Sequence, residues 1–131
     1  MGGSMIINME GDTTCITNKR LPSTGSPNDS LGRERVKQFT YDHSYWSVDP
    51  QDTKFAAQEK IFLDLGCDVV KSAYQGYNAC VFAYGQTGSG KTYTMMGAPG
   101  RSLKYGIQGE DFGLIPRICE HLFEEMDETD T

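Results

Sequence analysis

The sequence has no clustered metal ligands and no cysteine framework. Its few cysteines lack the paired spacing of a zinc site, and they are Cys15, Cys67, Cys80 and Cys119. No segment resembles a signal peptide, so reduced cytosolic thiols are expected. His43 and His121 each stand alone, without a Ser or Cys nucleophile signature. Because metal sites are clusters, both histidines are interpreted as ordinary surface or packing residues.

Positive charge is also scarce. The chain has 12 Lys and Arg residues against 18 Asp and Glu residues, which gives a net charge of −6. A surface of this sign repels phosphate backbones and anionic headgroups, so we expect no nucleic-acid partner and no direct membrane contact. No apolar run is long enough to span a bilayer. The acidic run Glu124–Asp130 is interpreted as a solvated end.

The length of the chain limits it to one domain or part of one, at 131 residues. Met1–Ser4, which reads MGGS, is interpreted as a cloning scar. The domain is therefore expected to run over residues 5–131, and it contains no internal repeats.

What the sequence does contain is the run YGQTGSGKTYTMMG at residues 84–97. Within it, Gly85–Thr92 fits the phosphate-loop pattern of Gly, four free positions, Gly, Lys and Ser or Thr. The alternative is a glycine-rich turn that binds nothing, but such a turn does not require Lys-Thr behind it. The pattern therefore predicts a nucleotide phosphate-binding loop.

Each residue type in this pattern has a physical reason. The glycines allow backbone angles and close approaches that a Cβ would forbid, so successive N–H groups can converge on phosphate oxygens. Lys91 is expected to reach the β- and γ-phosphates, and the Thr92 hydroxyl to complete the coordination of Mg²⁺. The predicted phosphate-binding residues are Gly85, Gln86, Thr87, Gly88, Ser89, Gly90, Lys91 and Thr92.

The segments on either side of the loop support this prediction. Ala79–Tyr84 is a nearly unbroken apolar and β-prone run, as expected of a strand buried on both faces. Lys91–Met96 contains no Gly or Pro and can begin a helix. Strand, glycine loop and helix therefore follow one another in the order that a phosphate loop requires.

Further elements are predicted before the loop. Met5–Met9 and Thr13–Thr17 are expected to be strands around a turn at Gly11-Asp12. Leu21–Arg35 is expected to be a loop because it is rich in Pro, Ser, Gly and Asn, and Val36–Trp46 to return to strand.

Two helices complete the prediction. The first follows Asp49-Pro50 and closes at Gly76, because apolar residues recur between them at helical spacing, and these are Phe55, Ile61, Phe62, Leu65, Val69, Val70 and Ala73. Residues 97–113 are glycine-rich and are expected to form a long loop. Ile115–Met126 is the second helix, with Pro116 in its first turn.

The phosphate-loop pattern and the residues around it resemble the nucleotide-binding core of a kinesin motor domain. The likeness is most specific where GYNACVFAY runs into GQTGSGKTYTMMG, at residues 76–97. YDHSYWSVD, AAQEKIF and GLIPRICEHLF are similar to segments of the vesicle-transporting third kinesin family. The resemblance covers nearly everything from Met5 onward.

The resemblance implies a fold, ligands and partners. It implies an α/β fold, part of a P-loop NTPase, in which a central and mostly parallel sheet carries helices on both faces. It implies ATP or ADP with Mg²⁺ as cofactors, and it places Tyr93 against the adenine ring, where an aromatic side chain can stack. The implied partners are microtubules, reached through parts of the parent motor outside this sequence, and the implied location is the cytoplasmic cytoskeleton. The cargo or adaptor is not implied.

The sequence also departs from the kinesin pattern. It contains no Arg-x-Arg-Pro segment, and neither of the switch motifs Asn-x-x-Ser-Ser-Arg and Asp-x-x-Gly-x-Glu, which sense the γ-phosphate and place the attacking water. We therefore expect no catalytic residues here, and a chain that holds nucleotide without hydrolysing it. Two alternatives are a nucleotide-binding module that is not a motor, and a degenerate structural protein that binds tubulin.

Overall fold

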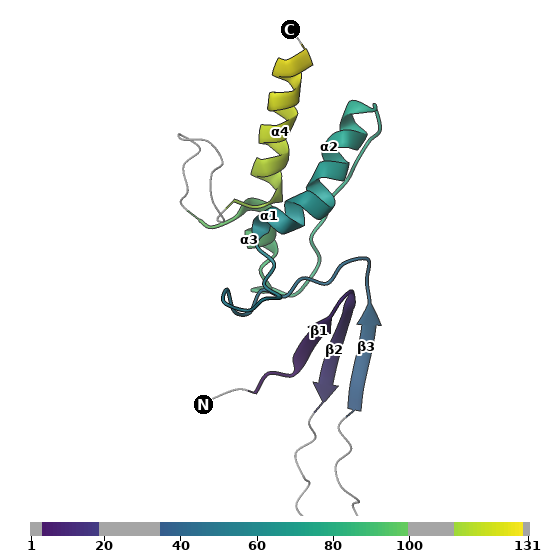
Figure 1. The fold of residues 1–131 in the computed structure, drawn as a ribbon, viewed down its shortest axis with the longest axis vertical. Helices are drawn as coiled ribbons and strands as arrows, with labels where there is room; N and C mark the ends of the chain where they lie inside the picture. The colour runs from purple at the N-terminus through teal and green to yellow at the C-terminus, as the bar shows by residue number, and fades with distance from the viewer. Residues whose placement is uncertain (1–3, 19–34, 100–111, 130–131) are drawn as a thin grey trace, which may run out of the picture. The chain divides into compact units, whose positions relative to one another are not determined.

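The computed structural model describes residues 4–18, 35–99 and 112–129 (Figure 1). The chain divides into two compact units, Met1–Val48 and Asp49–Thr131. The first consists of strands and the second of helices. The loop predicted at Leu21–Arg35 lies outside the described residues, except that Arg35 begins a strand.

The first unit is a three-stranded antiparallel sheet in the order β1-β2-β3. The strands are β1 Ile7–Glu10, β2 Thr13–Asn18 and β3 Arg35–Thr40. Glu10 pairs with Thr13, so Gly11 and Asp12 form a two-residue hairpin turn. Gly11 has a φ of 56°, as this tight turn requires, while Asp12 does not enter the left-handed region. The predicted hairpin is confirmed.

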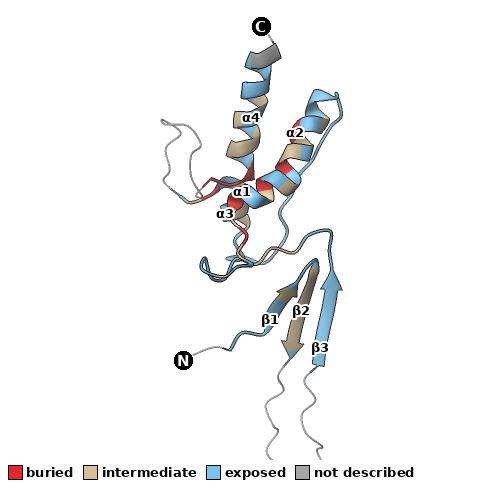
Figure 2. Cartoon of the chain, viewed as in Figure 1, coloured by how far each residue is buried: buried red, intermediate tan, exposed pale blue. Residues whose placement is uncertain are grey.

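The third strand is shorter than predicted, because the chain leaves the ladder after Thr40. The ladder ends there because Thr40 pairs with Thr13, the first residue of β2. The Tyr41 N–H then donates to the Asp12 carbonyl at 2.9 Å, and the Ser44 hydroxyl donates to the same carbonyl at 3.0 Å and lies 3.2 Å from the Thr14 hydroxyl. Every residue of β3 is exposed (Figure 2).

The second unit begins with one continuous helical path made of three elements. They are α1 Gln58–Ile61, the π-helical segment η1 Phe62–Gly66 and α2 Cys67–Tyr74. Phe62, Gly66 and Val70 are buried at a spacing of four residues and line one side of this path. A Cβ built on Gly66 would lie 2.8 Å from Phe62 Cε2, so the missing side chain leaves room for the ring. The helix starts at Gln58, later than predicted, and the π-helical segment was not predicted.

The path ends at Gly76, as predicted. The Tyr77 N–H donates to the Ser72 carbonyl and the Gly76 N–H to the Ala73 carbonyl, both at 3.0 Å. Gly76 has a φ of 81°. This pair of hydrogen bonds and the left-handed glycine form a Schellman motif, which satisfies carbonyls at the end of a helix.

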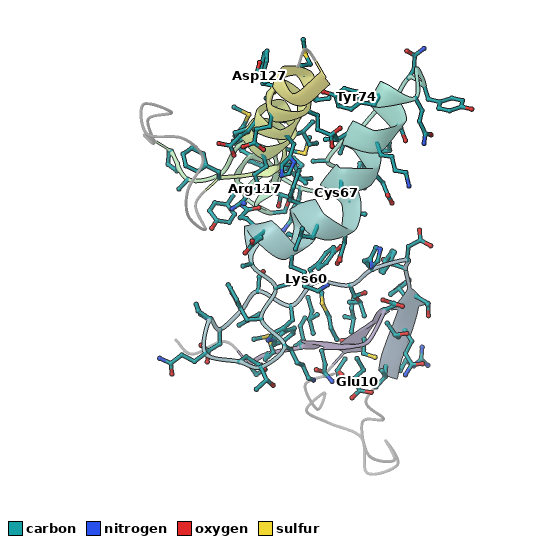
Figure 3. The ribbon with its side chains drawn as sticks, turned by 45° about the horizontal axis from the view of Figure 1, so that its top comes forward. Glu10, Lys60, Cys67, Tyr74, Arg117 and Asp127 are labelled. Carbon is teal, nitrogen blue, oxygen red and sulfur yellow. The ribbon has the colours of Figure 1, made fainter. Side chains whose placement is uncertain are left out.

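The last helix, α4 Leu114–Thr129, runs beside α2 (Figure 1). The Tyr74 hydroxyl donates to the Leu122 carbonyl at 2.5 Å and joins the two helices (Figure 3). Loss of solvent around this hydroxyl, and then the nearby Glu125 carboxylate, raises the pKa of Tyr74, so the hydroxyl keeps its proton at neutral pH. Pro116 lies in the first turn of α4, where its missing N–H costs no helical hydrogen bond.

The buried core of the second unit is small. Its buried apolar residues, red in Figure 2, come from the segment just before α1, from the helical path and from the residues around the start of α4, and they are Ala56, Phe62, Val70, Phe112 and Leu114. The Arg117 Nε–H donates to the Phe112 carbonyl at 3.0 Å and fixes the entry into α4. No described helix is long and apolar enough to cross a membrane.

The strand predicted at Ala79–Tyr84 is not present. These residues pair with no strand in the described part of the chain, and Phe82 and Tyr84 are 81% and 96% exposed. A strand needs a neighbour that takes up its N–H and C=O groups, and none of the described residues supplies one. The described sheet is accordingly antiparallel and comes from other residues than the central parallel sheet that the sequence predicts.

We expect the isolated 131-residue chain to self-associate. An apolar extended segment with free backbone groups is a template for pairing with another chain. Sedimentation velocity should show oligomers, and Phe82→Lys should reduce them more than Leu63→Lys, which alters another exposed apolar side chain on η1. A compact monomer with a sharp cooperative melt would contradict this expectation.

Candidate functional site

The glycine loop at residues 85–90 has the backbone shape that its sequence predicts. Gly85, Gly88 and Gly90 have φ values of 154°, 79° and 91°. A Cβ built on Gly85 would lie 2.7 Å from Ser89 Oγ, so any larger residue would force the loop open. Gly90 is the left-handed residue directly before the next helix, α3 Lys91–Met96. The glycines therefore permit both the tight curl of the loop and its entry into the helix.

The side chain of Lys91 folds back over this loop. Its Nζ donates to the Gly85 carbonyl and to the Gln86 carbonyl, both at 2.7 Å. The Ser89 N–H donates to the Gln86 carbonyl at 3.2 Å and closes the turn. The loop thus wraps around a single positive charge, and both lysine hydrogen bonds lie at the surface.

The remaining predicted site residues lie on or next to this loop. Thr87 is an exposed residue of the loop, and Thr92 is exposed in the first turn of α3. Tyr93 follows Thr92, and its side chain is 49% exposed rather than packed in the core. The Thr94 N–H donates to the Gly90 carbonyl at 2.9 Å, which is the first hydrogen bond of the helix. The structure therefore brings all of the predicted residues together at one loop and one helix start.

The helix α3 is held from one side by Gln58, the first residue of α1. Its Nε2 donates to the Tyr93 carbonyl at 2.7 Å, and the same carbonyl accepts the Gly97 N–H at 2.8 Å. Gln58 is 5% exposed, and its Oε1 is buried without a hydrogen-bond partner among the described residues. An unpaired buried oxygen of this kind costs about 1–3 kcal/mol.

Sequence reasoning did not identify Gln58. A signal was available, because Gln58 lies four residues before Phe62 and so continues the buried row of Phe62, Gly66 and Val70. A polar residue in such a row is expected to have a buried hydrogen-bond partner. That partner, the Tyr93 carbonyl, is 35 residues away in the sequence.

A close backbone contact holds α3 from another side. Gly97, which ends the helix, forms an antiparallel bridge with Phe112. A Cβ built on Gly113 would lie 2.6 Å from both Met95 C and Met96 N. Only glycine allows this approach, so the residues before α4 fit directly against the end of α3. Most of the loop predicted at residues 97–113 lies outside the described residues.

The described residues offer no clustered metal site. No group of three or more His, Cys, Asp or Glu side chains in residues 4–18, 35–99 and 112–129 could hold a metal ion. Cys15, Cys67, Cys80 and Cys119 form no disulfide in this structure. The two histidines lie apart: His43 stacks on Tyr45, and His121 packs against Phe62 with ring centroids 4.8 Å apart.

The fold and the loop define the class of protein first. A glycine loop that wraps a lysine and leads into a helix is the arrangement of P-loop NTPases. A family model described as the kinesin motor domain matches residues 6–131. The chain belongs to the kinesin motor domain family, so the predicted resemblance is confirmed.

Similar proteins agree with this assignment. The chain is 56% identical over 124 residues to kinesin-like protein KIF16B of Homo sapiens, an alignment that covers 95% of this chain and 8% of that protein. It is 51% identical over 126 residues to kinesin-like protein Klp98A of Drosophila melanogaster, covering 96% of this chain and 9% of that protein. The chain therefore spans less than a tenth of the length of these curated relatives.

Solved structures show the same fold. KIF14 with ADP in complex with a microtubule matches at a TM-score of 0.71 and 34% identity, covering 98% of this chain and 29% of that chain. A two-heads-bound KIF14 dimer with AMP-PNP in complex with a microtubule matches at a TM-score of 0.72 and 34% identity, with the same coverage. The predicted α/β P-loop NTPase class is thus confirmed.

The contact at Gly113 gives a test of how α3 is held. In the complete motor protein, Gly113→Ala should lower the free energy of unfolding by about 1–3 kcal/mol, because the added methyl group overpacks the backbone of α3. Thermal unfolding measures the change. The control is Gly76→Asn, at a left-handed glycine with open space around it, which should shift the midpoint much less. Equal shifts for the two variants would show that the contact is not tight.

Proposed function

We propose that this chain is the ATP-binding part of a microtubule motor that couples ATP hydrolysis to movement. The observation that carries the proposal is the Lys91 ammonium held by the Gly85 and Gln86 carbonyls inside the glycine loop. Membership of the kinesin motor domain family supports it, as do the microtubule complexes of KIF14. The identities of 56% to KIF16B and 41% to KIF1B support a place among the vesicle-transporting kinesins.

The residues present fit a nucleoside triphosphate with Mg²⁺. The loop has positive-φ glycines, the residues that allow successive backbone N–H groups to converge on an anion. Lys91 supplies the positive charge at its centre. The exposed Thr92 hydroxyl is an oxygen ligand of the kind that Mg²⁺ takes, and bound Mg²⁺ neutralises charge on the β- and γ-phosphate oxygens.

Tyr93 is proposed to contact the adenine. It follows directly after the loop residues on α3, and about half of its surface is exposed. An exposed aromatic ring beside a phosphate site offers a flat surface for stacking of a base. The alternative, that Tyr93 packs in the core, is not supported by this exposure.

We further propose that these 131 residues bind nucleotide without hydrolysing it. Phosphoryl transfer needs groups that position water and stabilise charge around the γ-phosphate, and the sequence contains neither switch motif. Microtubule binding is proposed to belong to other parts of the motor, because this region carries a net charge of −6. The proposed location is the cytoplasmic microtubule cytoskeleton.

We expect Lys91→Ala in the complete motor to weaken ATP binding by about 10- to 100-fold, because a charge-assisted phosphate contact is lost. Titration with a fluorescent ATP analogue measures the change. Lys71→Ala, at an exposed lysine of α2, is the matched control and should leave the affinity unchanged. Equal affinity of Lys91→Ala and the parent protein would remove Lys91 from the site.

Thr92→Ala should act through Mg²⁺. We expect this variant to lose affinity for ATP when Mg²⁺ is present and to match the parent protein when EDTA removes the ion, because only the metal ligand has changed. The same fluorescence titration, run with and without Mg²⁺, measures both affinities. An equal loss in both conditions would assign Thr92 a role in folding of the loop instead.

Measurement of phosphate release should distinguish the isolated chain from the complete motor. The complete protein is expected to hydrolyse ATP faster when polymerised tubulin is added. The 131-residue chain should show no stimulation, because the absent switch groups are worth factors on the order of 10³ to 10⁵ in rate. Stimulated release from the chain alone would reveal catalytic groups within it, and no stimulation of the complete protein would refute the motor function.

A further inference from the structure

We propose that Gln58 is a positioning residue that sets the direction of Tyr93 and thereby the affinity for the nucleotide base. The inference rests on the proposed ATP-binding function. Gln58 lies on α1 and Tyr93 on α3, and a single hydrogen bond of 2.7 Å joins them. No resemblance or motif assigns a role to this glutamine.

The burial of Gln58 is the first observation. It is the buried polar side chain among the described residues, at 5% exposure, and its neighbours in the same row, Phe62 and Val70, are apolar. Its Oε1 has no partner among the described residues. A side chain that served packing alone would be more favourable as Leu, because an apolar residue leaves no buried oxygen unpaired. The amide is therefore explained by what its Nε2 binds.

The acceptor of that hydrogen bond is placed where it can control Tyr93. The Tyr93 carbonyl accepts both Gln58 Nε2 and the Gly97 N–H, so both of its lone pairs are used. Two donors from different directions fix the plane of the peptide group between Tyr93 and Thr94. This plane fixes the backbone conformation at Tyr93, and the direction of the Tyr93 side chain follows from that conformation.

Phosphate binding by the loop depends on contacts other than the Gln58–Tyr93 hydrogen bond. Lys91 is held by the Gly85 and Gln86 carbonyls, and the Ser89 N–H closes the loop by donating to the Gln86 carbonyl. All three bonds lie within Gly85–Lys91, and none of them involves Gln58. Removing the Gln58 amide should therefore leave phosphate binding intact and loosen the half-exposed Tyr93 ring. Loss of the Gln58 amide should therefore lower the affinity for ATP and leave the affinity for a ligand without a base unchanged.

The test uses the complete motor protein, with MgATP and Mg-tripolyphosphate as ligands. Gln58→Leu keeps the side-chain volume and removes both the donor and the unpaired oxygen. We expect ATP affinity to fall about tenfold, the effect of losing one hydrogen bond, with tripolyphosphate affinity unchanged and a melting temperature no lower than that of the parent. Gln75→Leu, the same substitution at an exposed glutamine beyond α2, is the control and should change neither affinity.

A second variant keeps the test decisive if Gln58→Leu does not fold. Gln58→Glu has the same shape, and its ionised carboxylate cannot donate to the Tyr93 carbonyl. Burial raises the pKa of a carboxyl group, so lowering the pH from about 8 to about 6 should protonate it and restore the donor. The ratio of ATP affinity in this variant to that in the parent should therefore rise as the pH falls. A pH-independent ratio would overturn the proposal.

The outcomes separate this inference from the proposed function. If the parent protein binds neither ligand, the nucleotide site itself is refuted and Gln58 has nothing to position. If the parent binds both and Gln58→Leu binds ATP equally well, only the role of Gln58 is refuted. A fall in both affinities together with a lower melting temperature would show that Gln58 serves stability alone, and would also overturn the proposal.

Discussion

The candidate site depends on α3, a helix that is too short to be stable by itself. Only six residues, Lys91–Met96, form α3. Isolated helices shorter than about 12 residues have marginal stability in water, because the free-energy cost of nucleation exceeds what a few hydrogen bonds contribute. Its place is fixed by groups outside it, the Gln58 amide on the Tyr93 carbonyl and the close approach of Gly113 to Met95 and Met96. The position of Tyr93 on this helix is thus fixed only as well as these contacts allow.

The two contacts restrain α3 at different places. Gln58 binds the carbonyl of its third residue, while Gly113 packs against its last turn. Gly113 directly precedes α4, and the Tyr74 hydroxyl in turn joins α4 to α2. The end of α3 is therefore connected through Gly113 to α4, and through Tyr74 to α2.

The sequence predicted those parts of the structure that neighbouring residues decide. The positive-φ glycines at residues 85–90, the Gly11 turn, the Gly76 helix end and the Pro116 helix start each depend on residues within one turn of each other, and each has the backbone geometry that the sequence predicts. The positions of these turns and helix ends can be predicted because Gly and Pro restrict or extend the backbone angles at the residue where they stand. Tyr93 is half exposed, and its contact with a base stays a prediction.

The parts that were missed depend on distant residues. The apolar run Ala79–Tyr84 favours a strand, but pairing needs partners that the described residues do not supply. Phe62, the first residue of the π-helical segment, packs against His121, 59 positions away in the sequence. The buried Gln58 amide donates its hydrogen bond to a carbonyl on another helix, that of Tyr93. Periodicity and propensity carry no information on such pairs.

The acidic balance of the chain and its candidate anion site are compatible because charge acts locally. At physiological ionic strength the Debye length is about 8 Å, so a bound phosphate would respond mainly to the groups that line the loop. Those groups are the Lys91 ammonium, the loop N–H groups and the start of α3. The carbonyls of Gly85 and Gln86 that now hold the ammonium are neutral acceptors. An ionised phosphate oxygen forms a stronger bond with the same cation, so the lysine can exchange these partners without leaving the loop.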